Sequence, residues 1–482
     1  MKIVLVASEV VPFAKTGGLA DVAGALPKAL AKKGVSVSVI MPYYSSISAK
    51  QFKIKPTKTK VRVKILDQEV EGKIYKTTTE DNINVYFIEQ PKYFDRKELY
   101  QTKEGDFKDN AERFSFFSKA AIETILALKL KCDVIHCNDW QTSLIPVYLK
   151  TTYSNNKQLK GVKTLLTIHN LGYQGVFWHM DMPFLGLDWS LFTFDKLEFY
   201  GKINFLKGGI VFADAISTVS KKYAQEILSP EYGCGLENAL KQRAHDIYGI
   251  LNGIDYTDWD PKTDKFIPKK FTLSNLSGKE SCKSELQKRF KLPLKKNVPV
   301  IGIVSRLAAQ KGFDLLENAI PTIMEKDVQV VVLGTGETRY HELFEIFSKK
   351  YPTKMGVALT FNNAIAHLIE AGSDMFLMPS RYEPCGLNQM ISMKYGTTPI
   401  VRATGGLDDS VIPFNFKTLK GNGFKFNNYD SNDMIISINQ AIIGFHNKKI
   451  WKTLVKNDMN EDFSWDRSAK EYIALYKKLS VS

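Results

Sequence analysis

The chain has 482 residues, of which 44% are hydrophobic and 24% are charged, so a disordered or collagen-like chain is excluded and two or three domains are expected. No run reaches the roughly 18 apolar residues that span a bilayer, and Glu9 and Lys15 interrupt the apolar start before it could form a signal peptide. The formal net charge of +15 favours anionic partners, but the lysines are spread over the whole length without zinc-finger spacing or an aromatic and basic stripe, so we expect neither a nucleic-acid nor a membrane partner.

The first half of the chain alternates between strand and helix patterns. Residues 22–34 and 107–128 carry apolar side chains at helical spacing. The lysine-rich stretch over about 52–90 alternates instead, as strands with one exposed face do. Short apolar runs predict buried strands at 3–7, 35–41, 133–137, 164–168, 215–219 and 247–251.

The second half repeats this alternation after a break. Residues 254–297 are dominated by Asp, Pro, Lys, Ser and Asn and predict a connection between domains. Strands are then predicted at 300–304, 328–333, 357–361, 375–378 and 399–402, with helices between them. Because strand–helix–strand units of this length require parallel sheets with right-handed crossovers, we expect an α/β fold of two doubly wound domains, residues 1–254 and 255–459, that face each other.

A glycine-containing loop follows the first strand of each set. Ligands in such sheets bind beyond the carboxyl ends of the strands. Lys15, Gly17 and Gly18 precede a helix start, which suits an anion because paired glycines let the backbone approach phosphate oxygens; an ordinary glycine-rich turn explains them equally well. Arg306 and Lys311, five residues apart, suit a diphosphate or are simply solvated cations. Neither loop matches a Walker or a GxGxxG motif.

Polar residues also follow other predicted strands. Glu383 comes after the strand at 375–378, where a carboxylate can hold sugar hydroxyls, meet a developing cation or only support a helix cap. His169 and Asn170 end one predicted strand, and Asp139 follows the strand before it. A lone histidine is more often structural, but two polar side chains at a strand's carboxyl end favour a binding site. Cys385 has no base nearby and is expected to be a small buried residue.

The sequence predicts no metal site. It contains no HExxH motif, no CxxC pair and no histidines at ligand spacing. The five cysteines are odd in number, which argues against a disulfide framework and indicates a reducing, cytoplasmic location. Asp408 and Asp409 are the nearest acidic pair, but they lie at a predicted helix start, where the helix dipole alone favours carboxylates. We therefore expect neither a metal ion nor another cofactor.

Taken together, these motifs are similar to those of one family. The chain resembles bacterial glycogen synthases and the related plant starch synthases over essentially its full length. The motifs that carry the resemblance are KTGGLADV at 15–22, IHNL at 168–171, YQG at 173–175, YGCGL at 232–236, LNGID at 251–255, SRLAAQKG at 305–312, EPCGL at 383–387 and TGGL at 404–407. The combination of KTGGLADV and EPCGL in this order is far more specific than any single glycine loop.

The resemblance implies a GT-B architecture, in which two Rossmann-like domains face each other across a cleft, and a glucosyl transfer. The N-terminal domain would take the glucan acceptor, the C-terminal domain would bind the nucleotide sugar, and a last helix at about 460–482 would pack back on the N-terminal domain. The implied reaction moves glucose from ADP-glucose, with UDP-glucose as the alternative donor, to the 4-hydroxyl at the non-reducing end of glycogen or another α-1,4-glucan. The anomeric configuration is retained, no metal is used, and the two halves are expected to close over the donor.

The resemblance also implies roles for individual residues. The implied catalytic residues are Glu383, His169 and Asp139. The implied substrate-binding residues are Lys15, Gly17, Gly18, Asn170, Asn252, Arg306, Lys311, Phe361, Cys385, Gly386, Leu387, Thr404, Gly405 and Gly406. Lys15 and Gly18 would contact the donor's phosphates, Arg306 and Lys311 would neutralise the leaving diphosphate, and Glu383 would lie beside the transferred glucose.

Further implied roles concern the sugar pocket and the nucleotide. His169, Asn170, Asp139 and Asn252 would line the sugar pocket from the N-terminal domain. Thr404, Gly405 and Gly406 would close on phosphate or nucleotide. Phe361 stands where some members carry a Tyr that stacks on the base, and Asn388 stands where others have Thr, so the preferred nucleotide is less sharply specified than the reaction.

Three other kinds of protein compete with this interpretation. A glucan phosphorylase has a similar shape but needs a pyridoxal phosphate lysine and is usually much longer. A nucleotide-sugar epimerase would need no glucan acceptor. A non-enzymatic glucan-binding protein would not need Arg306, Lys311 and Glu383, and all three are present.

Retention of configuration could arise by double displacement or by a front-face route. We expect the front-face route, with Glu383 as an electrostatic and positioning group.

Overall fold

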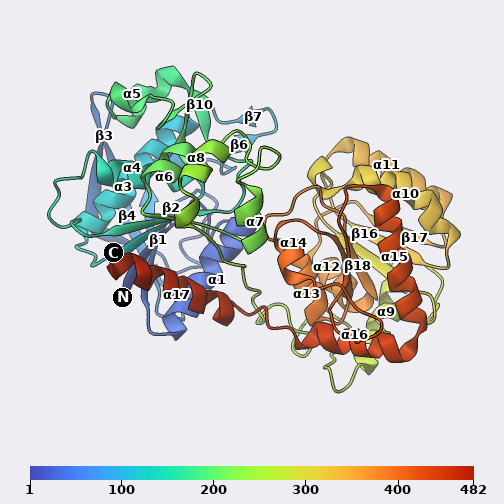
Figure 1. Ribbon diagram of the computed structural model, residues 1–482. Coiled ribbons are helices and arrows are strands. Elements are labelled where there is room, and N and C mark those ends of the chain that lie inside the picture. Colours follow the sequence, from blue (N-terminus) through green and yellow to red (C-terminus); the bar gives the residue numbers. More distant parts are fainter. Residues whose placement is uncertain (482) are drawn as a thin grey trace. The chain divides into compact units, whose positions relative to one another are not determined.

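Two large, mainly parallel sheets organise the chain in the computed structural model, which describes residues 1–481 (Figure 1). The N-terminal unit comprises Met1–Val219, Ala224–Ile250 and the described chain from Trp465 onward, and the C-terminal unit comprises Ser220–Tyr223 and Leu251–Ser464. The sequence places its domain boundary at 254/255, whereas the chain contacts divide at Ile250/Leu251. The last residue of the predicted C-terminal helix, 482, lies outside the described residues.

The N-terminal unit contains a nine-stranded sheet in the order β14-β13-β9-β8-β1-β2-β5-β4-β3. Its strands are β1 (Lys2–Val6), β2 (Ser36–Pro42), β3 (Lys55–Ile65), β4 (Gln68–Thr78), β5 (Asn84–Glu89), β8 (Val134–Asn138), β9 (Lys163–Ile168), β13 (Ala215–Thr218) and β14 (Ile247–Gly249). Pairing is parallel from β14 to β5, and β4 and β3 add an antiparallel edge. The edge strands carry the lysine-rich alternation: Val61, Val63 and Ile65 are buried while their neighbours are exposed.

Helices surround this sheet, and a small second sheet lies at one end of the unit. The helices are α1 (Gly18–Lys32), α2 (Pro91–Phe94), α3 (Asn110–Ala127), α4 (Leu144–Lys150), α5 (Met182–Leu185), α6 (Phe205–Phe212), α7 (Lys221–Glu226, which begins in the C-terminal unit), α8 (Glu237–Gln242) and α17 (Trp465–Val481). The small sheet has the order β10-β12-β11, with β10 (Val176–Trp178), β11 (Glu198–Phe199) and β12 (Lys202–Asn204), and β6 (Gln101–Thr102) pairs with β7 (Gly105–Asp106).

The last helix belongs to the N-terminal unit although it follows the whole C-terminal unit in sequence. It packs against α1, and Lys33 forms an ion pair with Asp466 at 3.0 Å. Tyr476 hydrogen bonds to Nδ1 of the buried His136 at 2.8 Å. Burial lowers the pKa of His136 to about 3, so the imidazole in this contact is neutral.

The C-terminal unit is a doubly wound domain with an all-parallel sheet in the order β17-β16-β15-β18-β19-β20. Its strands are β15 (Val300–Val304), β16 (Gln329–Leu333), β17 (Met355–Ala358), β18 (Met375–Met378), β19 (Thr398–Arg402) and β20 (Phe424–Phe426). Its helices are α9 (Ser277–Arg289), α10 (Phe313–Glu325), α11 (Thr338–Lys350), α12 (Asn363–Gly372), α13 (Asn388–Lys394), α14 (Gly405–Ser410), α15 (Ser431–His446) and α16 (Lys448–Asn460).

Side-chain alternation explains why both faces of this sheet are covered. Along β15, Ile301 and Ile303 pack into a core formed with α10 and α15, while Val300 packs into a second core formed with α9 and α12. Successive side chains of a strand point to opposite faces, so a continuous apolar run needs helices on both sides. The predicted α/β class with parallel sheets in two domains is thus confirmed.

Three local predictions differ from the structure. The predicted connection at 254–297 contains α9, which was not predicted because it is mostly polar and buries few apolar side chains, among them Cys282 and Leu286. The strand predicted at 357–361 lies earlier, at β17, and β20 was not predicted.

Within residues 1–481, no helix is long and apolar enough to cross a membrane.

Candidate active site

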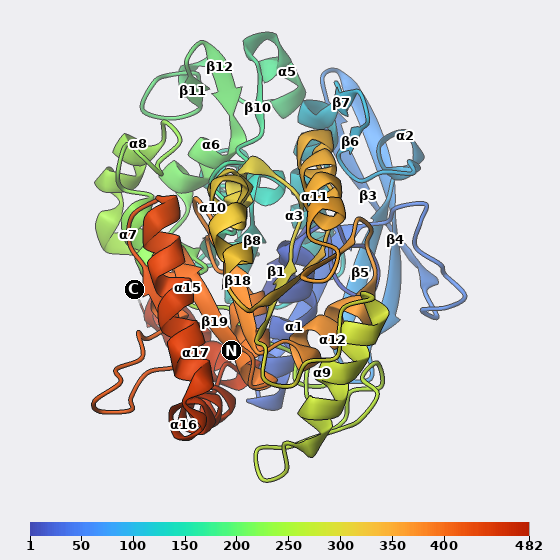
Figure 2. The ribbon, with the colours of Figure 1, turned by 90° about the vertical axis from the view of Figure 1, so that its right-hand side faces the viewer.

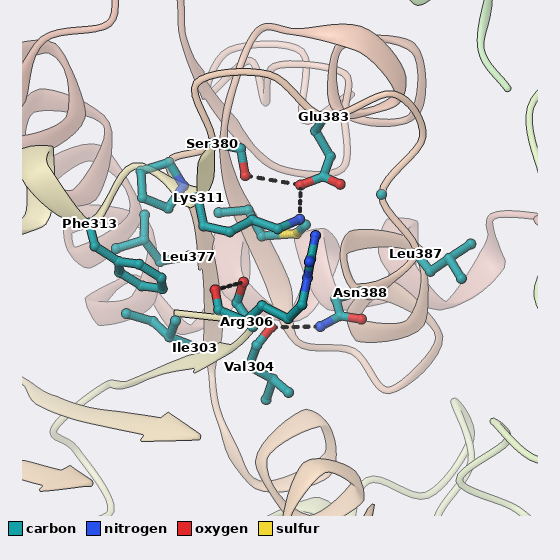
Figure 3. Close-up of a pocket in the computed structure, with 14 residues that line it drawn as sticks. Ile303, Val304, Arg306, Lys311, Phe313, Leu377, Ser380, Glu383, Leu387 and Asn388 are labelled. Carbon is teal, nitrogen blue, oxygen red and sulfur yellow. Dashed lines mark hydrogen bonds and ion pairs between the residues drawn. The ribbon is translucent and has the colours of Figure 1, made fainter. Parts of the chain in front are cut away.

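The C-terminal unit holds a cavity of about 150 Å³ at the carboxyl ends of β15 and β18 (Figure 3). Its lining includes Arg306 and Lys311 from the loop after β15, and Ser380 and Glu383 from the loop after β18. β15 and β18 are neighbours in the sheet, so the two loops meet at the same edge. The two motifs that the sequence analysis treated separately therefore form one pocket.

Glu383 is the fixed centre of this pocket. Lys311 Nζ lies 2.6 Å from Glu383 Oε2, and Ser380 Oγ donates to the same oxygen at 3.0 Å. Figure 3 shows both groups directed at this oxygen, and no contact is drawn to the other carboxylate oxygen. Because Glu383 is only 7% exposed, its charge needs this cation, and the pair holds both side chains in place.

Arg306 is the exposed cation of the pocket. Within residues 1–481 its guanidinium has no hydrogen-bond or ion-pair partner, in contrast to Lys311. A hydrogen bond fixes the start of the loop that carries Arg306, since the side-chain amide of Asn388 donates to the carbonyl oxygen of Val304 at 2.8 Å. An arginine held at a cavity rim with all its donors free can bind an anionic group in bidentate fashion.

The backbone of Gly405 and Gly406 packs directly against the backbone of the Glu383 loop. The amide of Gly406 donates to the carbonyl oxygens of Glu383 and Pro384, both at 3.1 Å. A Cβ at position 405 would lie 2.0 Å from the carbonyl oxygen of Glu383, and one at 406 would lie 1.9 Å from that of Cys385. The glycine pair thus permits close backbone packing; contact of Thr404, Gly405 and Gly406 with a nucleotide stays a prediction.

Cys385 and Asn252 lie together beneath the same loop. Burial raises the pKa of the Cys385 thiol to about 12, and hydrogen bonds from the main chain and side chain of Asn252 reach it. The thiol is therefore not a nucleophile, as expected from the sequence. The placement of Asn252 in the N-terminal domain was wrong: the chain enters the C-terminal unit at Leu251, so Asn252 packs against Cys385 there. Its buried Oδ1 has no partner among the described residues.

The remaining predicted residues of this unit differ in their exposure. Gly386 and Leu387 line the cavity. Phe361 lies between β17 and α12 and is 85% exposed, the most exposed phenylalanine of the described chain, and it is not part of the cavity lining. A ring of this size left in water is free to stack on a ligand. Stacking on a base stays a prediction.

A second polar cluster lies in the N-terminal unit, at the carboxyl ends of β8 and β9. Asp139 adopts a left-handed backbone conformation, with φ 54°, and its Oδ1 accepts the His169 amide at 2.7 Å. Burial, with a smaller contribution from the nearby Glu9, raises the pKa of Asp139 to about 7. His169 Nε2 lies 3.0 Å from Asn138 Oδ1, and burial lowers the pKa of His169 to about 3. Asn170 also donates its amide to Asp139.

The loop with Lys15 is held by a carboxylate that the sequence analysis did not select. Glu9 Oε2 accepts hydrogen bonds from the amide of Thr16 at 2.5 Å and from its hydroxyl at 2.8 Å. Lys15 itself pairs with Asp21 at 2.7 Å. A Cβ at Gly18 would meet no atom within 4 Å, so the backbone there is open, whereas part of the loop's hydrogen-bonding capacity is already used. The available signal for Glu9 was its place in the loop that follows β1.

Comparison with known proteins decides the family. A family model described as the starch synthase catalytic domain matches residues 2–242, and one described as glycosyl transferases group 1 matches residues 284–450. The glycogen synthase of Koribacter versatilis is 49% identical over 99% of this chain and 98% of that protein. The chain belongs to the glycogen synthase and starch synthase family. This family member is therefore a glycosyltransferase, and the resemblance deduced from the motifs is confirmed.

Other relatives and solved structures agree with this family. The glycogen synthase of Thermosipho melanesiensis is 47% identical over 99% of both chains. The catalytic domain of starch synthase IV from Arabidopsis thaliana, bound to ADP and acarbose, is 35% identical and superimposes with a TM-score of 0.91 over 100% of this chain and 99% of that one, which confirms the GT-B fold. Sucrose-phosphate synthase from Thermosynechococcus elongatus, at 17% identity and a TM-score of 0.62, shares the fold.

The acidic residues of this family member do not gather into a metal site within the described chain. Among residues 1–481, no group of three or more His, Cys, Asp or Glu side chains could hold an ion. Asp408 pairs with Lys425 at 2.7 Å, and Asp409 accepts the amide of Lys222 at 2.9 Å, so both have structural partners. Independence from metal ions stays a prediction.

Proposed function

We propose that this family member transfers glucose from ADP-glucose to the 4-hydroxyl at the non-reducing end of an α-1,4-glucan, with retention of configuration. The observation that carries the proposal is the pocket in which Glu383 is fixed by Lys311 while Arg306 stays free. A nucleotide sugar needs positive charge at its departing diphosphate and a positioned carboxylate near its sugar, and this pocket offers both.

In the proposed reaction, the bond between the glucose C1 and the diphosphate oxygen breaks, and the electron pair leaves with ADP. Arg306 and Lys311 stabilise the negative charge that develops on the leaving group. The acceptor O4 forms the new bond to C1 on the same face, and its proton passes to the departing phosphate oxygen. Glu383 positions the glucose and stabilises the positive charge at C1.

The N-terminal cluster suits the sugar hydroxyls. The depressed pKa of His169, caused by burial, keeps its imidazole neutral, and the raised pKa of Asp139, at about 7, makes that carboxyl a weaker acid than usual. Groups that are neutral or nearly so can donate to and accept from hydroxyls without a large desolvation cost. We infer that Asp139, His169 and Asn170 bind sugar.

ADP as the donor nucleotide rests on the relatives: one related structure holds ADP, and several relatives carry the name glycogen synthase. The test is an initial-rate assay of the purified chain with glycogen and either ADP-glucose or UDP-glucose. We expect the higher kcat/KM with ADP-glucose, release of ADP, and α-1,4 linkages in the product. A higher kcat/KM with UDP-glucose would overturn the choice of nucleotide, and transfer to water alone would overturn the acceptor.

We also infer a cytoplasmic location. All five cysteines are free, and Cys137 and Cys282 are fully buried. Free thiols persist in a reducing compartment. Cell fractionation with an antibody should find the chain in the cytoplasmic fraction, and recovery from a membrane or secreted fraction would contradict this.

A further inference from the structure

The C-terminal unit holds a second cavity, between α9, α12 and the loop at 265–268, which we call the α9–α12 cavity. Its volume is about 530 Å³, against about 150 Å³ for the cavity around Glu383, and the two share no lining residue. α9 and α12 pack side by side (Figure 2). Sites for small organic molecules measure about 300–1,000 Å³, so this cavity is large enough for such a ligand.

The buried part of the lining is apolar. Ile267 is 7% exposed, and Ile365 and Leu368 of α12 are each 8% exposed. Phe266 also lines the cavity and is 38% exposed, so part of its ring is open to a ligand. Because aromatic rings stack on one another, the cavity favours a ligand that contains a flat ring.

Two cations of the lining have no anionic partner among residues 1–481. The side chain of Lys265 forms no hydrogen bond or ion pair, and its ammonium lies 5.2 Å from the centroid of the Phe266 ring. The side chain of Arg289, in the last turn of α9, is also without a polar partner, although Glu285 lies one helical turn before it. A phosphate monoester carries about −1.5 to −2 charges at pH 7, and arginine binds phosphate in bidentate fashion. The lining therefore suits a ring that carries a phosphate.

Buried contacts hold the loop that carries Lys265 and Phe266. Asp264 Oδ1 accepts the amide of Phe266 at 2.8 Å, and Asp264 Oδ2 lies 2.7 Å from Nδ1 of His367 in α12. The His367 ring packs on that of Phe266 at 4.8 Å and stacks on that of Trp259 at 3.8 Å. A ligand therefore does not need to order this loop, which would lower its affinity.

The cavity reaches the residue next to the ring predicted to stack on the donor's base. Asn362 lines the cavity and caps α12, since its side-chain oxygen accepts the amide of Ile365 at 3.0 Å. Phe361 directly precedes Asn362. A ligand that contacts Asn362 can therefore shift the Phe361 ring, and two ligands that bias the same element change each other's affinity.

We propose that the α9–α12 cavity binds a mononucleotide, with its base on Phe266 and its phosphate on Lys265 and Arg289, and that its binding changes the affinity for the donor. The binding itself does not depend on the proposed function, whereas the effect on the donor rests on it. Inorganic phosphate would leave the ring and the apolar lining unused, and an uncharged apolar molecule would leave both cations unpaired. The exposed carboxylate of Glu285 can accept the ribose hydroxyls.

The test uses AMP as the probe and isothermal titration calorimetry as the measurement. The full chain carries Arg306→Ala, so that the donor pocket has lost its free cation. We expect AMP to bind this chain about 5-fold or more tightly than ribose 5-phosphate, because a base that stacks on a ring contributes about 1 kcal/mol or more. Adding Phe266→Ala and Arg289→Ala should weaken AMP binding about 10-fold or more, since both the ring and a charged donor are lost.

Two controls accompany these variants. Phe266→Tyr keeps the ring and should keep the affinity, and Lys288→Ala removes an exposed cation of α9 that does not line the cavity. Unaltered AMP binding after Phe266→Ala and Arg289→Ala would overturn the site, as would loss of all AMP binding on Arg306→Ala alone. Equal affinities for AMP and ribose 5-phosphate would overturn the choice of a mononucleotide.

The effect on the donor is measured by the KM for ADP-glucose with and without AMP. AMP that competes in the donor pocket raises this KM in any variant, so the wild type is compared with the chain that carries only Phe266→Ala and Arg289→Ala. We expect the responses of the two to AMP to differ about 5-fold or more. Identical responses would overturn the coupling. Failure of the proposed function would show separately, as absence of glucose transfer by a chain whose α9–α12 cavity still binds AMP.

Discussion

The two polar clusters of the chain differ in whether their side chains are ionised. In the N-terminal unit, Asp139 is buried and His169 is partly buried, and desolvation shifts the pKa of each in the direction that favours its neutral form. In the C-terminal unit, Lys311 and Glu383 meet as an ion pair, and Arg306 is exposed beside them. The same kind of strand end thus carries a nearly neutral site in one unit and an ionic site in the other.

This difference indicates which part of the reactants each unit handles. A diphosphate carries charge that grows as it leaves, so it needs cations placed in advance. A glucan is uncharged, and ionised groups would have to give up hydration to bind its hydroxyls. The following predictions test this division, beginning with the largest expected effect.

Glu383→Ala should reduce kcat by about 100-fold or more, because it removes a preorganised carboxylate and leaves the Lys311 cation unpaired. Steady-state kinetics with ADP-glucose and glycogen measures the loss, and circular dichroism verifies the fold. Ser380→Ala removes only the second hydrogen bond to the same oxygen and should cost much less. Near-normal kcat in a folded Glu383→Ala variant would remove Glu383 from the mechanism.

Arg306→Ala should lower kcat roughly 10- to 100-fold, because a donor aimed at developing charge is lost. Its side chain has no partner within residues 1–481, so thermal stability should hardly change. Arg306→Lys should restore part of the rate. Arg339→Ala is the matched control, since this exposed arginine pairs with Glu317 away from the pocket. Equal rates for Arg306→Ala and Arg339→Ala would break the proposed division.

Phe361→Ala should raise the KM for the donor by about 5-fold or more and affect kcat less, since base stacking on an aromatic ring contributes about 1 kcal/mol or more. The side chain is 85% exposed, so the fold should be unaffected. Leu294→Ala, also exposed in this unit, serves as the control. A donor KM that matches the control would show that Phe361 does not contact the nucleotide.

Asp139→Asn should change how stability depends on pH. The folded carboxyl has a pKa of about 7, against about 4 in an unfolded chain, so the native state holds the proton more tightly and the wild type gains stability as pH falls from 7 toward 4. Relative to the variant, the free energy of unfolding of the wild type should increase by about 1 kcal/mol between pH 8 and pH 6.

Urea unfolding followed by fluorescence measures this difference for Asp139→Asn. Asp67→Asn, at the exposed turn between β3 and β4, should differ from the wild type by the same amount at both pH values. The opposite result would be a free energy of unfolding of the wild type that decreases, relative to that of Asp139→Asn, as the pH falls from 8 to 6. It would mean that the surroundings of Asp139 stabilise its ionised form and not its neutral form.

The smallest expected effect is that of chelation. Excess EDTA should leave initial rates nearly unchanged, because Arg306 and Lys311 supply the positive charge that a divalent ion supplies in other nucleotide-sugar enzymes. Loss of activity on chelation, with recovery on adding magnesium or manganese, would show that the charge in the C-terminal unit is incomplete without an ion.

Motifs at strand ends could be predicted from the sequence, and isolated supporting residues could not. The loops with Arg306 and Glu383 follow strongly apolar strands, and because β15 and β18 are neighbours, they meet in one pocket. Glu9 was missed because nothing in its immediate sequence says that its carboxylate turns back to Thr16. Such contacts depend on tertiary packing, which local pattern does not encode.

Two further features could not be predicted from the sequence: a mostly polar helix and the point at which the chain crosses between the two units. α9 escaped prediction because Lys283, in its buried face, is stabilised by the carbonyl of Val298 at 2.8 Å and by Asp374 at 2.7 Å rather than by apolar contacts. Asn252 was assigned to the wrong domain because the crossing at Leu251 follows a strand without any glycine- or proline-rich linker. Where a chain crosses between units is decided by contacts, not by composition.

The return of α17 to the N-terminal unit has a consequence for synthesis of the chain. The C-terminal unit is almost continuous in sequence, from Leu251 to Ser464, whereas the N-terminal unit needs the helix from Trp465 to Val481 to cover α1 and to bring Tyr476 to His136. On a ribosome, which releases the chain from its N-terminus onward, the first unit to emerge is therefore the last to be completed. A ribosome that stops at residue 464 would release a finished C-terminal unit attached to an N-terminal unit with an open seam along α1.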